Sequence, residues 1–408
     1  MTKDKIRQIL EDTAYIRTGG SAEELRCAQY IQNVCKEMGM DAYLEEFEVD
    51  MADMKKAVLT VDGEEIPCTG YLCAGSGVVE APLYYMPNDD KYSLSQCKGK
   101  IVMTDAYLRH WMYQDMLEAG AVGFITYSGD ANYADEEIDT RELRQAVSLG
   151  KKILGVNINA KQAIRLVEND CKMARIELEQ DEYKGKSHNV IVDLPGEVEE
   201  TIVFTAHYDS TALSQGVYDN MSGSVGILGI AEYFTTHPHK YSLRFVWCGS
   251  EERGLLGSKA YVANHEDILD KIVFNINLDM IGSTMGRFIA VCTTEDKLVS
   301  YLKYYGDIEG FPMAVRQEVY SSDSTPFADK GVPALSFARI APHNTATIHN
   351  SHDTIAVMKM EHMEKDIAFI TKFSDVMANA VRLPVDRKIP DNMKEKLDIY
   401  LLRKRDER

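Results

Sequence analysis

The chain has 408 residues, of which 45% are hydrophobic, and a formal net charge of −19. This length corresponds to roughly two or three domains, and the hydrophobic content is typical of globular proteins with sizeable cores. The acidic charge excludes nucleic acid as an expected partner and argues against an anionic membrane surface, because both bind basic faces. It is compatible with cationic substrates such as free amines, although solubility is the simpler explanation.

The N-terminal segment and the cysteines favour a cytoplasmic location. Residues 1–17 contain no uninterrupted apolar core, so they do not resemble a secretory signal. No segment approaches the ~20 apolar residues of a membrane span. The eight cysteines are therefore expected to be reduced thiols, and the closest pair, Cys68 and Cys73, has no common zinc or redox spacing.

The first fifty residues predict two helices and a strand. Apolar residues recur with helical spacing within residues 3–17 and again within 21–40. Ser21 has the side chain of an N-cap, and Glu24, three residues later, would complete a capping box. Residues 42–49 then alternate between apolar and polar side chains, which is typical of an edge strand.

A change of pattern separates a middle segment, residues 62–182, from the rest of the chain. Short apolar runs alternate there with Gly, Asn and Asp clusters, and a helix-like stretch lies at 112–121. This pattern predicts a small β-rich inserted domain with one or two helices. Its only histidine, His110, is expected to be structural or at the surface. Residues 1–61 and 183–408 are predicted to form the other domain.

The C-terminal half alternates strand and helix patterns. Strand-like apolar runs occupy residues 201–208, 243–250 and 272–279, and helical patterns at 224–234 and 254–264 separate them. This order predicts an α/β domain in which helices cover both faces of a mostly parallel, mixed sheet. Ligands of such sheets bind at the carboxyl ends of the strands.

Imidazole and carboxylate side chains occur at these predicted strand ends and in the loops that follow. Taken singly, each has a structural explanation, such as a buried core histidine or an N-cap aspartate. Taken together, buried carboxylates at several strand ends repel one another unless a cation neutralises them. Nitrogen and oxygen ligands with room for water are what a hydrolytic zinc site needs. The candidates are His207, Asp209, Asp219, Glu251, Glu252, Asp279 and His349.

The chemistry of such a site requires more than ligands. One carboxylate must bridge if two metal ions lie ~3.5–4 Å apart. Adjacent glutamates on a loop point in different directions, so one of Glu251 and Glu252 can bind metal while the other takes a proton from water. Asp209, two residues after His207, can accept a hydrogen bond from the second nitrogen of the imidazole.

The candidate residues belong to six short motifs, whose order along the chain resembles that of the co-catalytic di-zinc aminopeptidases of clan MH. Their wider family includes glutamate carboxypeptidases, glutaminyl cyclases and the non-catalytic transferrin receptor. The resemblance extends over roughly residues 187–380, and upstream stretches at 98–106 and 117–127 are similar to the protease-associated domain inserted in many members. The motifs are His-x-Asp at 207–209, Asp-Asn-x-Ser-Gly at 219–223, Glu-Glu-x-Gly-Leu-x-Gly-Ser at 251–258, Asn-Leu-Asp-Met-Ile-Gly at 277–282, Ser-Asp-x-x-Pro-Phe at 322–327 and His-x-x-x-Asp-Thr at 349–354.

The resemblance implies a zinc-exopeptidase fold and two zinc ions per chain. It also implies that Glu251 is the general base and that Asp209 orients a histidine ligand. The implied ligands are His207 and Asp279 for one ion, Glu252 and His349 for the other, and Asp219 as the bridge.

The spacing in this resemblance selects His349 as the last ligand, with His352 as the alternative. The family often has a tyrosine before this histidine, where it helps to stabilise the oxyanion. Ile348 stands there in this chain, so the oxyanion donor stays unassigned.

Other candidate residues have weaker support. Asp323 is expected to line the substrate pocket, although Ser324 stands where the family often has a histidine. Arg339 could meet a substrate carboxylate, with a structural ion pair as the alternative. His237 and His239 have ligand-like spacing, but they follow a helical pattern in a polar loop and are expected at the surface.

The sequence therefore predicts a zinc-dependent exopeptidase, most simply an aminopeptidase acting on short peptides. A carboxypeptidase or a glutaminyl cyclase on the same scaffold is the alternative, and the complete ligand set favours two metal ions over the single zinc of such cyclases. A non-catalytic binding protein would have lost ligands or the base, and none is lost here. The preferred side chain does not follow from the sequence, and a homodimer is compatible with it.

Overall fold

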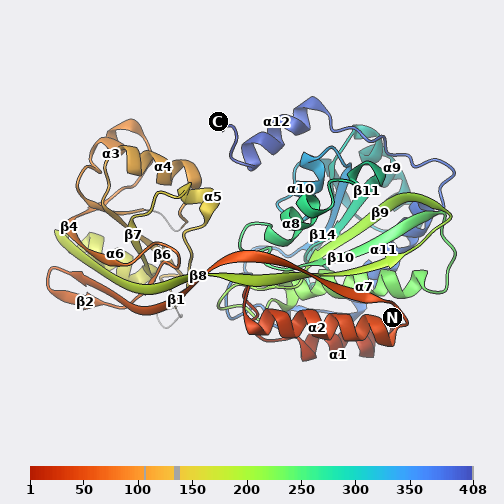
Figure 1. The fold of residues 1–408 in the computed structure, drawn as a ribbon, viewed down its shortest axis with the longest axis horizontal. Coiled ribbons are helices and arrows are strands. Elements are labelled where there is room, and N and C mark those ends of the chain that lie inside the picture. The colour runs from red at the N-terminus through yellow and green to blue at the C-terminus, as the bar shows by residue number, and fades with distance from the viewer. Residues whose placement is uncertain (105–106, 133–137, 407–408) are drawn as a thin grey trace. The chain divides into compact units, whose positions relative to one another are not determined.

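A computed structural model describes residues 1–104, 107–132 and 138–406 and divides the chain into two compact units (Figure 1). Unit 1 comprises Met1–Val49 and Lys186–Arg408, and unit 2 comprises Asp50–Gly185.

Two long strands carry the chain from one unit to the other. Strand β1 (Ala42–Val61) crosses the first boundary and strand β8 (Met173–Leu194) crosses the second. The middle segment expected from the sequence, residues 62–182, falls within unit 2. Its limits differ from those of the unit because each strand continues through the boundary without a break in its extended backbone.

Unit 1 begins with two helices, α1 (Lys3–Asp12) and α2 (Ala22–Glu37). The expectation of a helix to residue 17 is wrong, because Thr13 ends α1 and its hydroxyl donates back to the carbonyl of Ile9 at 2.7 Å. The N-cap of α2 is Ser21, whose hydroxyl accepts a hydrogen bond from the backbone of Glu24, as predicted.

The sheet of unit 1 has the strand order β13-β12-β14-β11-β9-β10-β8. Its four central strands, β14, β11, β9 and β10, are parallel to one another. Strand β8 is antiparallel to β10, and β12 is antiparallel to β14. The sheet is therefore mixed and mostly parallel, which confirms the predicted fold class. The bounds are β9 Val198–His207, β10 Tyr241–Cys248, β11 Ile272–Leu278, β12 Arg287–Thr293, β13 Ala314–Gln317 and β14 Ala334–Ile340.

Helices cover both faces of this sheet (Figure 1). Alternate residues of β9 belong to two different cores: Phe204 is part of the core that includes residues of α1, α2, α7, α9 and α11, whereas Val203 is part of the core that includes residues of α8 and α10. Helix α12 lies against α10. The bounds are α7 Ser222–Phe234, α8 Leu256–Asn264, α9 Asp296–Glu309, α10 Ser324–Asp329, α11 Met360–Ala378 and α12 Asp391–Tyr400.

Unit 2 contains a sheet of its own, in the order β8-β4-β5-β6-β7-β3, while β2 pairs with β1. Strands β4 to β7 are parallel, and β3 and β8 are antiparallel to their neighbours. The bounds are β2 Glu64–Ile66, β3 Cys68–Gly70, β4 Gly77–Tyr85, α3 Lys91–Ser95, β5 Ile101–Met103, α4 His110–Glu118, β6 Gly123–Ser128, α5 Gln145–Ser148, β7 Leu154–Asn159 and α6 Ala160–Glu168.

The histidine of unit 2 is structural. His110 is buried at the start of α4, and its Nδ1 lies 2.6 Å from the carbonyl oxygen of Ala146. Of the stretch at 98–106 that is similar to a protease-associated domain, the last two residues lie outside the described part of the chain. Within the described residues, no helix is both long enough and apolar enough to cross a membrane.

Candidate metal centre

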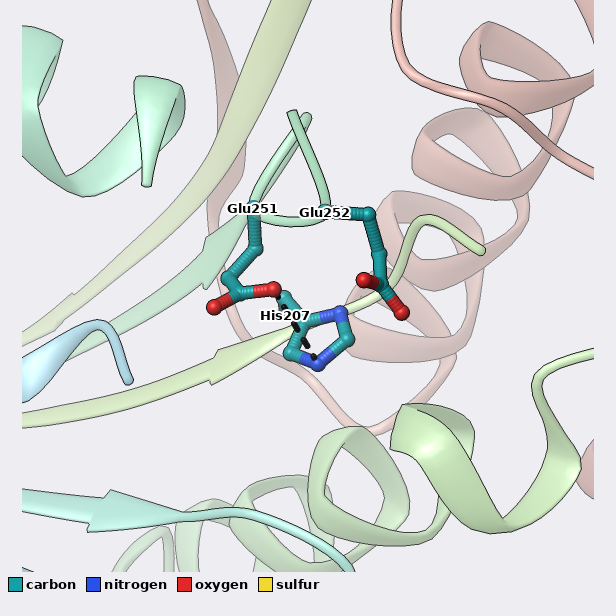
Figure 2. A group of neighbouring side chains, drawn as sticks. All are labelled: His207, Glu251 and Glu252. Carbon is teal, nitrogen blue, oxygen red and sulfur yellow. Dashed lines mark ion pairs between the residues drawn. The ribbon is translucent and has the colours of Figure 1, made fainter. Parts of the chain in front are cut away.

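Parallel strands of unit 1 end at the same edge of the sheet, and their ends carry the candidate ligands. His207 closes β9 and pairs in register with Cys248, the last residue of β10. Glu251 and Glu252 follow β10 after two residues, and Asp279 directly follows β11. Figure 2 shows the two glutamates leaving one loop in different directions beside the imidazole of His207. The register of the sheet thus brings residues from three separate strands to one place.

Asp219 lies between the two histidines. It belongs to the distorted turn Val217–Met221 that leads into α7, and its side chain is buried. Its Oδ1 lies 3.2 Å from Nε2 of His207, and its Oδ2 lies 3.2 Å from Nε2 of His349. One carboxylate therefore directs a separate oxygen atom toward each imidazole, which is the arrangement that a bridging ligand needs.

The remaining ligand candidates complete two groups around this carboxylate. His207, Asp219 and Asp279 form one group, and Asp219, Glu252 and His349 form the other. In the first, Nε2 of His207 lies 3.7 Å from Oδ1 of Asp279. In the second, Nε2 of His349 lies 3.1 Å from Oε2 of Glu252. A third group, His207 with Glu251 and Glu252, overlaps both.

The donor set fits metal ions in distance and in charge. Zinc bonds of about 2.0–2.1 Å in a tetrahedral arrangement separate the ligand atoms by about 3.3 Å. The four imidazole–carboxylate distances within the two groups, 3.1 to 3.7 Å, bracket this value. Oδ1 of Asp279 is buried and has no hydrogen-bond partner, so it is free to accept a cation.

Burial and the charges of neighbouring side chains shift the pKa values of the candidate ligands. Burial disfavours the charged imidazole of His349, but Asp219 and Glu252 outweigh this effect and raise its pKa to about 12. Burial raises the pKa of Glu252 and of Asp279, and neighbouring carboxylates add to the effect. Both directions reflect an excess of negative charge that divalent cations would neutralise.

Glu251 is the carboxylate of the centre that the two ligand groups do not require. Its Oε2 lies 3.8 Å from Nε2 of His207, and its side chain is 12% exposed. Burial raises the pKa of Glu251 well above its ordinary value, and the charges of Glu252 and Asp323 raise it further. A raised pKa makes a carboxylate a stronger base, and so a better acceptor of a proton from water, than an ordinary glutamate.

Asp209 connects the histidine to both glutamates. It is fully buried, and its Oδ1 lies 3.3 Å from Nδ1 of His207, on the side of the ring away from the other ligands. Its two carboxylate oxygens also accept hydrogen bonds from the backbone N–H groups of Glu251 at 3.0 Å and Glu252 at 3.1 Å. The sequence argument anticipated the contact with the imidazole but not the contacts with the glutamate loop.

Comparison with known proteins agrees with this geometry. Residues 189–372 match the model of peptidase family M28. Residues 189–372 belong to this family. The resemblance found in the sequence is thus confirmed at the level of the family, and the protease-associated assignment of the insert stays a prediction.

Relatives of this chain include named aminopeptidases. The aminopeptidase YwaD of Bacillus subtilis is 25% identical over 368 residues, which cover 86% of this chain and 78% of that protein. The leucine aminopeptidase 2 of Trichophyton equinum is 36% identical over 146 residues, which are 36% of this chain and 26% of that relative.

Solved structures share the fold. A zinc aminopeptidase from Bacillus subtilis superposes with a TM-score of 0.77 at 23% identity, covering 96% of this chain and 98% of that one. An aminopeptidase from Aneurinibacillus sp. strain AM-1 gives a TM-score of 0.75 at 21% identity, with 95% and 96% covered.

The structure also separates the two C-terminal histidines. His349 belongs to the second ligand group, whereas His352, three residues later, is exposed and belongs to none of the groups found among the described residues. His237 is exposed as well, and its Nδ1 lies 2.8 Å from the carbonyl oxygen of Tyr233. His239 is half-buried in the same loop.

The expectation that Arg339 meets a substrate carboxylate is wrong. Its guanidinium forms two hydrogen bonds to Asp366, from Nε at 2.8 Å and from Nη2 at 2.5 Å. Asp366 is fully buried on α11 and also accepts a hydrogen bond from the backbone of Gly282. This bidentate pair occupies the guanidinium, so the structural alternative holds.

Asp323 lies deeper than the expected position on a substrate pocket. It is 1% exposed, and neither of its oxygen atoms has a hydrogen-bond partner. Burial raises the pKa of Asp323 to about 7. A side chain so well covered cannot form much of a substrate surface in this structure, although its charge acts on Glu251.

Sequence reasoning missed the residue that holds the turn of Asp219. Asp353 is fully buried and accepts hydrogen bonds from the backbone N–H groups of Tyr218 at 2.7 Å and Asp219 at 3.0 Å. It belongs to the His-x-x-x-Asp-Thr motif, so its place four residues after His349 was the available signal.

Two further residues act around the ligands. Asn220 accepts hydrogen bonds from the backbone of Gly223 and Met280 and donates to the carbonyl of Leu278, which joins the Asp219 turn to the end of β11. Burial, together with the negative charges of Asp279 and Asp219, raises the pKa of Tyr320. The negative charge of the centre therefore acts on the phenol of Tyr320. In the sequence, Tyr320 stands two residues before the Ser-Asp-x-x-Pro-Phe motif.

Proposed function

We propose that this protein is a zinc-dependent aminopeptidase with two zinc ions per chain. The observation that carries the proposal is the pair of ligand groups that share Asp219, with Glu251 beside them and outside both. Membership of peptidase family M28 and the aminopeptidase names of its relatives support the same activity.

The residues of the chain divide the work of peptide hydrolysis. Bound zinc ions supply Lewis-acid chemistry, since they polarise a carbonyl oxygen and lower the pKa of water. Glu251 accepts the proton of the attacking water and delivers it to the leaving amine. Asp209 holds the ring of His207 and the backbone of both glutamates, so the base and the ligands keep a fixed relation.

The charge of the centre favours the amino end of a peptide. The ligands and the base present carboxylates to a bound substrate, and an α-ammonium group is attracted to them whereas an α-carboxylate is repelled. Arg339, the cation that the sequence offered for a carboxyl end, is held by Asp366. An aminopeptidase therefore fits better than a carboxypeptidase.

Digestion of a mixed peptide library, with analysis of the products, tests this activity. We expect single residues to be released from N-termini, and the chelator-treated protein to release none. Acetylating the N-terminus of a cleaved peptide should block hydrolysis, whereas amidating its C-terminus should not. The reverse pattern would identify a carboxypeptidase, and loss of water from N-terminal glutamine would identify a cyclase.

The zinc stoichiometry has a separate test. Elemental analysis of protein purified with added zinc should approach two ions per chain.

We propose short peptides as the substrates and the cytoplasm as the location. The protease-associated identity of the insert and a homodimeric assembly complete the proposal.

A further inference from the structure

The connection between α1 and α2 contacts both loops that carry the metal ligands. We call residues 13–24, which include the first turn of α2, the N-terminal brace. One of the loops runs from His207 to Asp219, and the other contains Glu251 and Glu252. The brace holds each through side chains that are fully or almost fully buried.

Arg17 is the main contact with the first loop. Its side chain is 0% exposed, and its hydrogen bonds all go to backbone carbonyls. Within the first loop, Nε donates to Tyr208, Nη1 to Gln215, and Nη2 to Gly216 at 2.7 Å. Nη1 also donates to Thr13 and Tyr15 of the brace itself.

These carbonyl groups lie at both ends of the loop. Tyr208 stands between His207 and Asp209, and Gly216 lies three residues before Asp219. A planar guanidinium has five N–H donors in a rigid fork, so one side chain can fix both ends at once. A lysine ammonium at the same position cannot span them.

The loop is fitted closely around the guanidinium. Gly216 has a positive φ of 55°, and a Cβ added there would lie 2.9 Å from Nη2 of Arg17 and 2.8 Å from Cβ of Ser210. The hydroxyl of Ser210 accepts a hydrogen bond from the backbone of Arg17 at 3.1 Å, and the Ser210 N–H donates to the Arg17 carbonyl at 3.2 Å.

The same brace holds the second loop through Glu24. This carboxylate is 1% exposed, and its Oε1 accepts hydrogen bonds from the backbone N–H of Ser250 at 2.7 Å and from the Ser250 hydroxyl at 3.0 Å. Gly19 approaches the same turn so closely that a Cβ added to it would lie 2.4 Å from the hydroxyl oxygen of Ser250. Ser250 directly precedes Glu251.

We propose that Arg17 is a positioning residue for the metal centre: from the N-terminal brace, it fixes the loop that places Asp209 and Asp219 relative to His207. This inference deepens the proposed function and rests on it for the identity of the reaction. The expected effect of Arg17 on metal binding does not depend on which reaction the protein catalyses. Among the described residues, the Arg17 guanidinium donates hydrogen bonds only to carbonyl groups. Burying a charge in this way is a costly means of gaining stability alone, which favours a role in the geometry of the site.

The test is Arg17→Lys, which keeps the charge and removes the fork. Zinc affinity, measured by chelator competition, should fall about 10- to 100-fold, as it does when partners of metal ligands are altered. At saturating zinc, kcat for an aminoacyl anilide should fall about tenfold, with KM within about threefold of wild type. Zinc affinity and kcat both within twofold of wild type would overturn the proposal.

Arg244→Lys is the matched control. Arg244 lies on β10, remote from the end of that strand that carries the candidate ligands. Its guanidinium pairs with Asp193 of β8 and Tyr261 of α8. This variant should leave zinc affinity within about twofold of wild type even where it lowers the melting temperature. Equal losses in the two variants would show that Arg17 acts only through stability, and the proposal would be wrong.

Ser210→Ala decides the question if Arg17→Lys does not fold. It removes one contact with the brace without leaving a charge unpaired, so a smaller loss of zinc affinity, about threefold, is expected. Unchanged affinity would contradict the proposal. If wild type binds zinc but hydrolyses no N-terminal residue, the proposed function fails, while the effect of Arg17→Lys on zinc affinity still tests the positioning role.

Discussion

Glu251 and Glu252 are neighbours in the chain but have different surroundings. Oε2 of Glu252 lies 3.1 Å from His349 within a ligand group, whereas Oε2 of Glu251 lies 3.8 Å from His207 and is not needed as a ligand. We expect Glu251→Gln to lower kcat at least about 100-fold, because the proton acceptor is lost. Metal content should stay near wild type. Glu252→Gln should instead lower metal content, and equal metal loss in both variants would show that this division of roles is wrong.

The two histidines make metal binding dependent on pH. Although burial opposes it, the surrounding carboxylates raise the pKa of His349 to about 12 and the pKa of His207 well above its ordinary value. Both imidazoles therefore carry protons at neutral pH in the metal-free protein, and a metal ion must displace one proton from each.

Apparent zinc affinity should accordingly rise as the pH rises. We expect an increase of up to about tenfold per pH unit for each ion between about pH 6 and pH 8, since one proton is released per histidine. Chelator competition at several pH values measures the slope, and calorimetry in buffers of different ionisation enthalpy counts the protons. An affinity that does not change with pH would show that the imidazoles are already neutral.

Asp353 contributes through the turn that carries Asp219, the proposed bridging ligand. Its carboxylate is the acceptor for the backbone N–H groups of Tyr218 and Asp219. Asp353→Ala leaves these buried donors unpaired, so the free energy of unfolding should fall by about 1–3 kcal/mol, and zinc affinity should fall with it. Chemical denaturation of the metal-free protein and chelator competition measure the two effects. If Asp353→Asn, which keeps one acceptor, were as impaired as Asp353→Ala, the backbone contacts would not be the cause.

At the scale of elements, the sequence predicted what local pattern and strand order determine. The apolar runs before His207, Glu251 and Asp279 are strands, and parallel strands end at one edge, so the convergence of these residues followed from the alternation of strands and helices. Motif spacing then added Asp219 and His349, which lie on loops that no periodicity describes.

Long-range contacts account for what the sequence did not predict. Arg17 hydrogen-bonds to carbonyl groups 191 to 199 residues away in the chain, and nothing in its local pattern indicates this. The apolar spacing predicted a helix up to residue 17. Helix α1 instead ends at Thr13, so Arg17 lies outside the helix and contacts the loop from His207 to Asp219. The ion pair between Arg339 of β14 and Asp366 of α11 likewise depends on two elements that meet only in the folded protein.

At the scale of the molecule, the chain passes from the insert into the catalytic unit close to the centre. Strand β8 enters unit 1 at Lys186 and pairs antiparallel with β10, with Val190 opposite Trp247 near the end of β10 that leads to Glu251. The hydroxyl oxygen of Ser187 lies 2.9 Å from that of Ser250, within hydrogen-bond distance. The first residues of unit 1 after the insert therefore lie beside the loop that carries Glu251.

From this attachment we predict that the insert restricts access to the centre. Long or folded substrates should be excluded because the chain segment that joins the insert to unit 1 borders the catalytic loop, whereas short peptides should enter freely. Comparing kcat/KM for a dipeptide or an aminoacyl anilide with the rate of N-terminal trimming of an intact folded protein tests this. The control is the same N-terminal sequence presented as a free peptide, which separates access from side-chain preference. Trimming of the folded protein as efficiently as of the free peptide would show that the insert is no barrier, and contact between copies of the chain would then be its better-supported role.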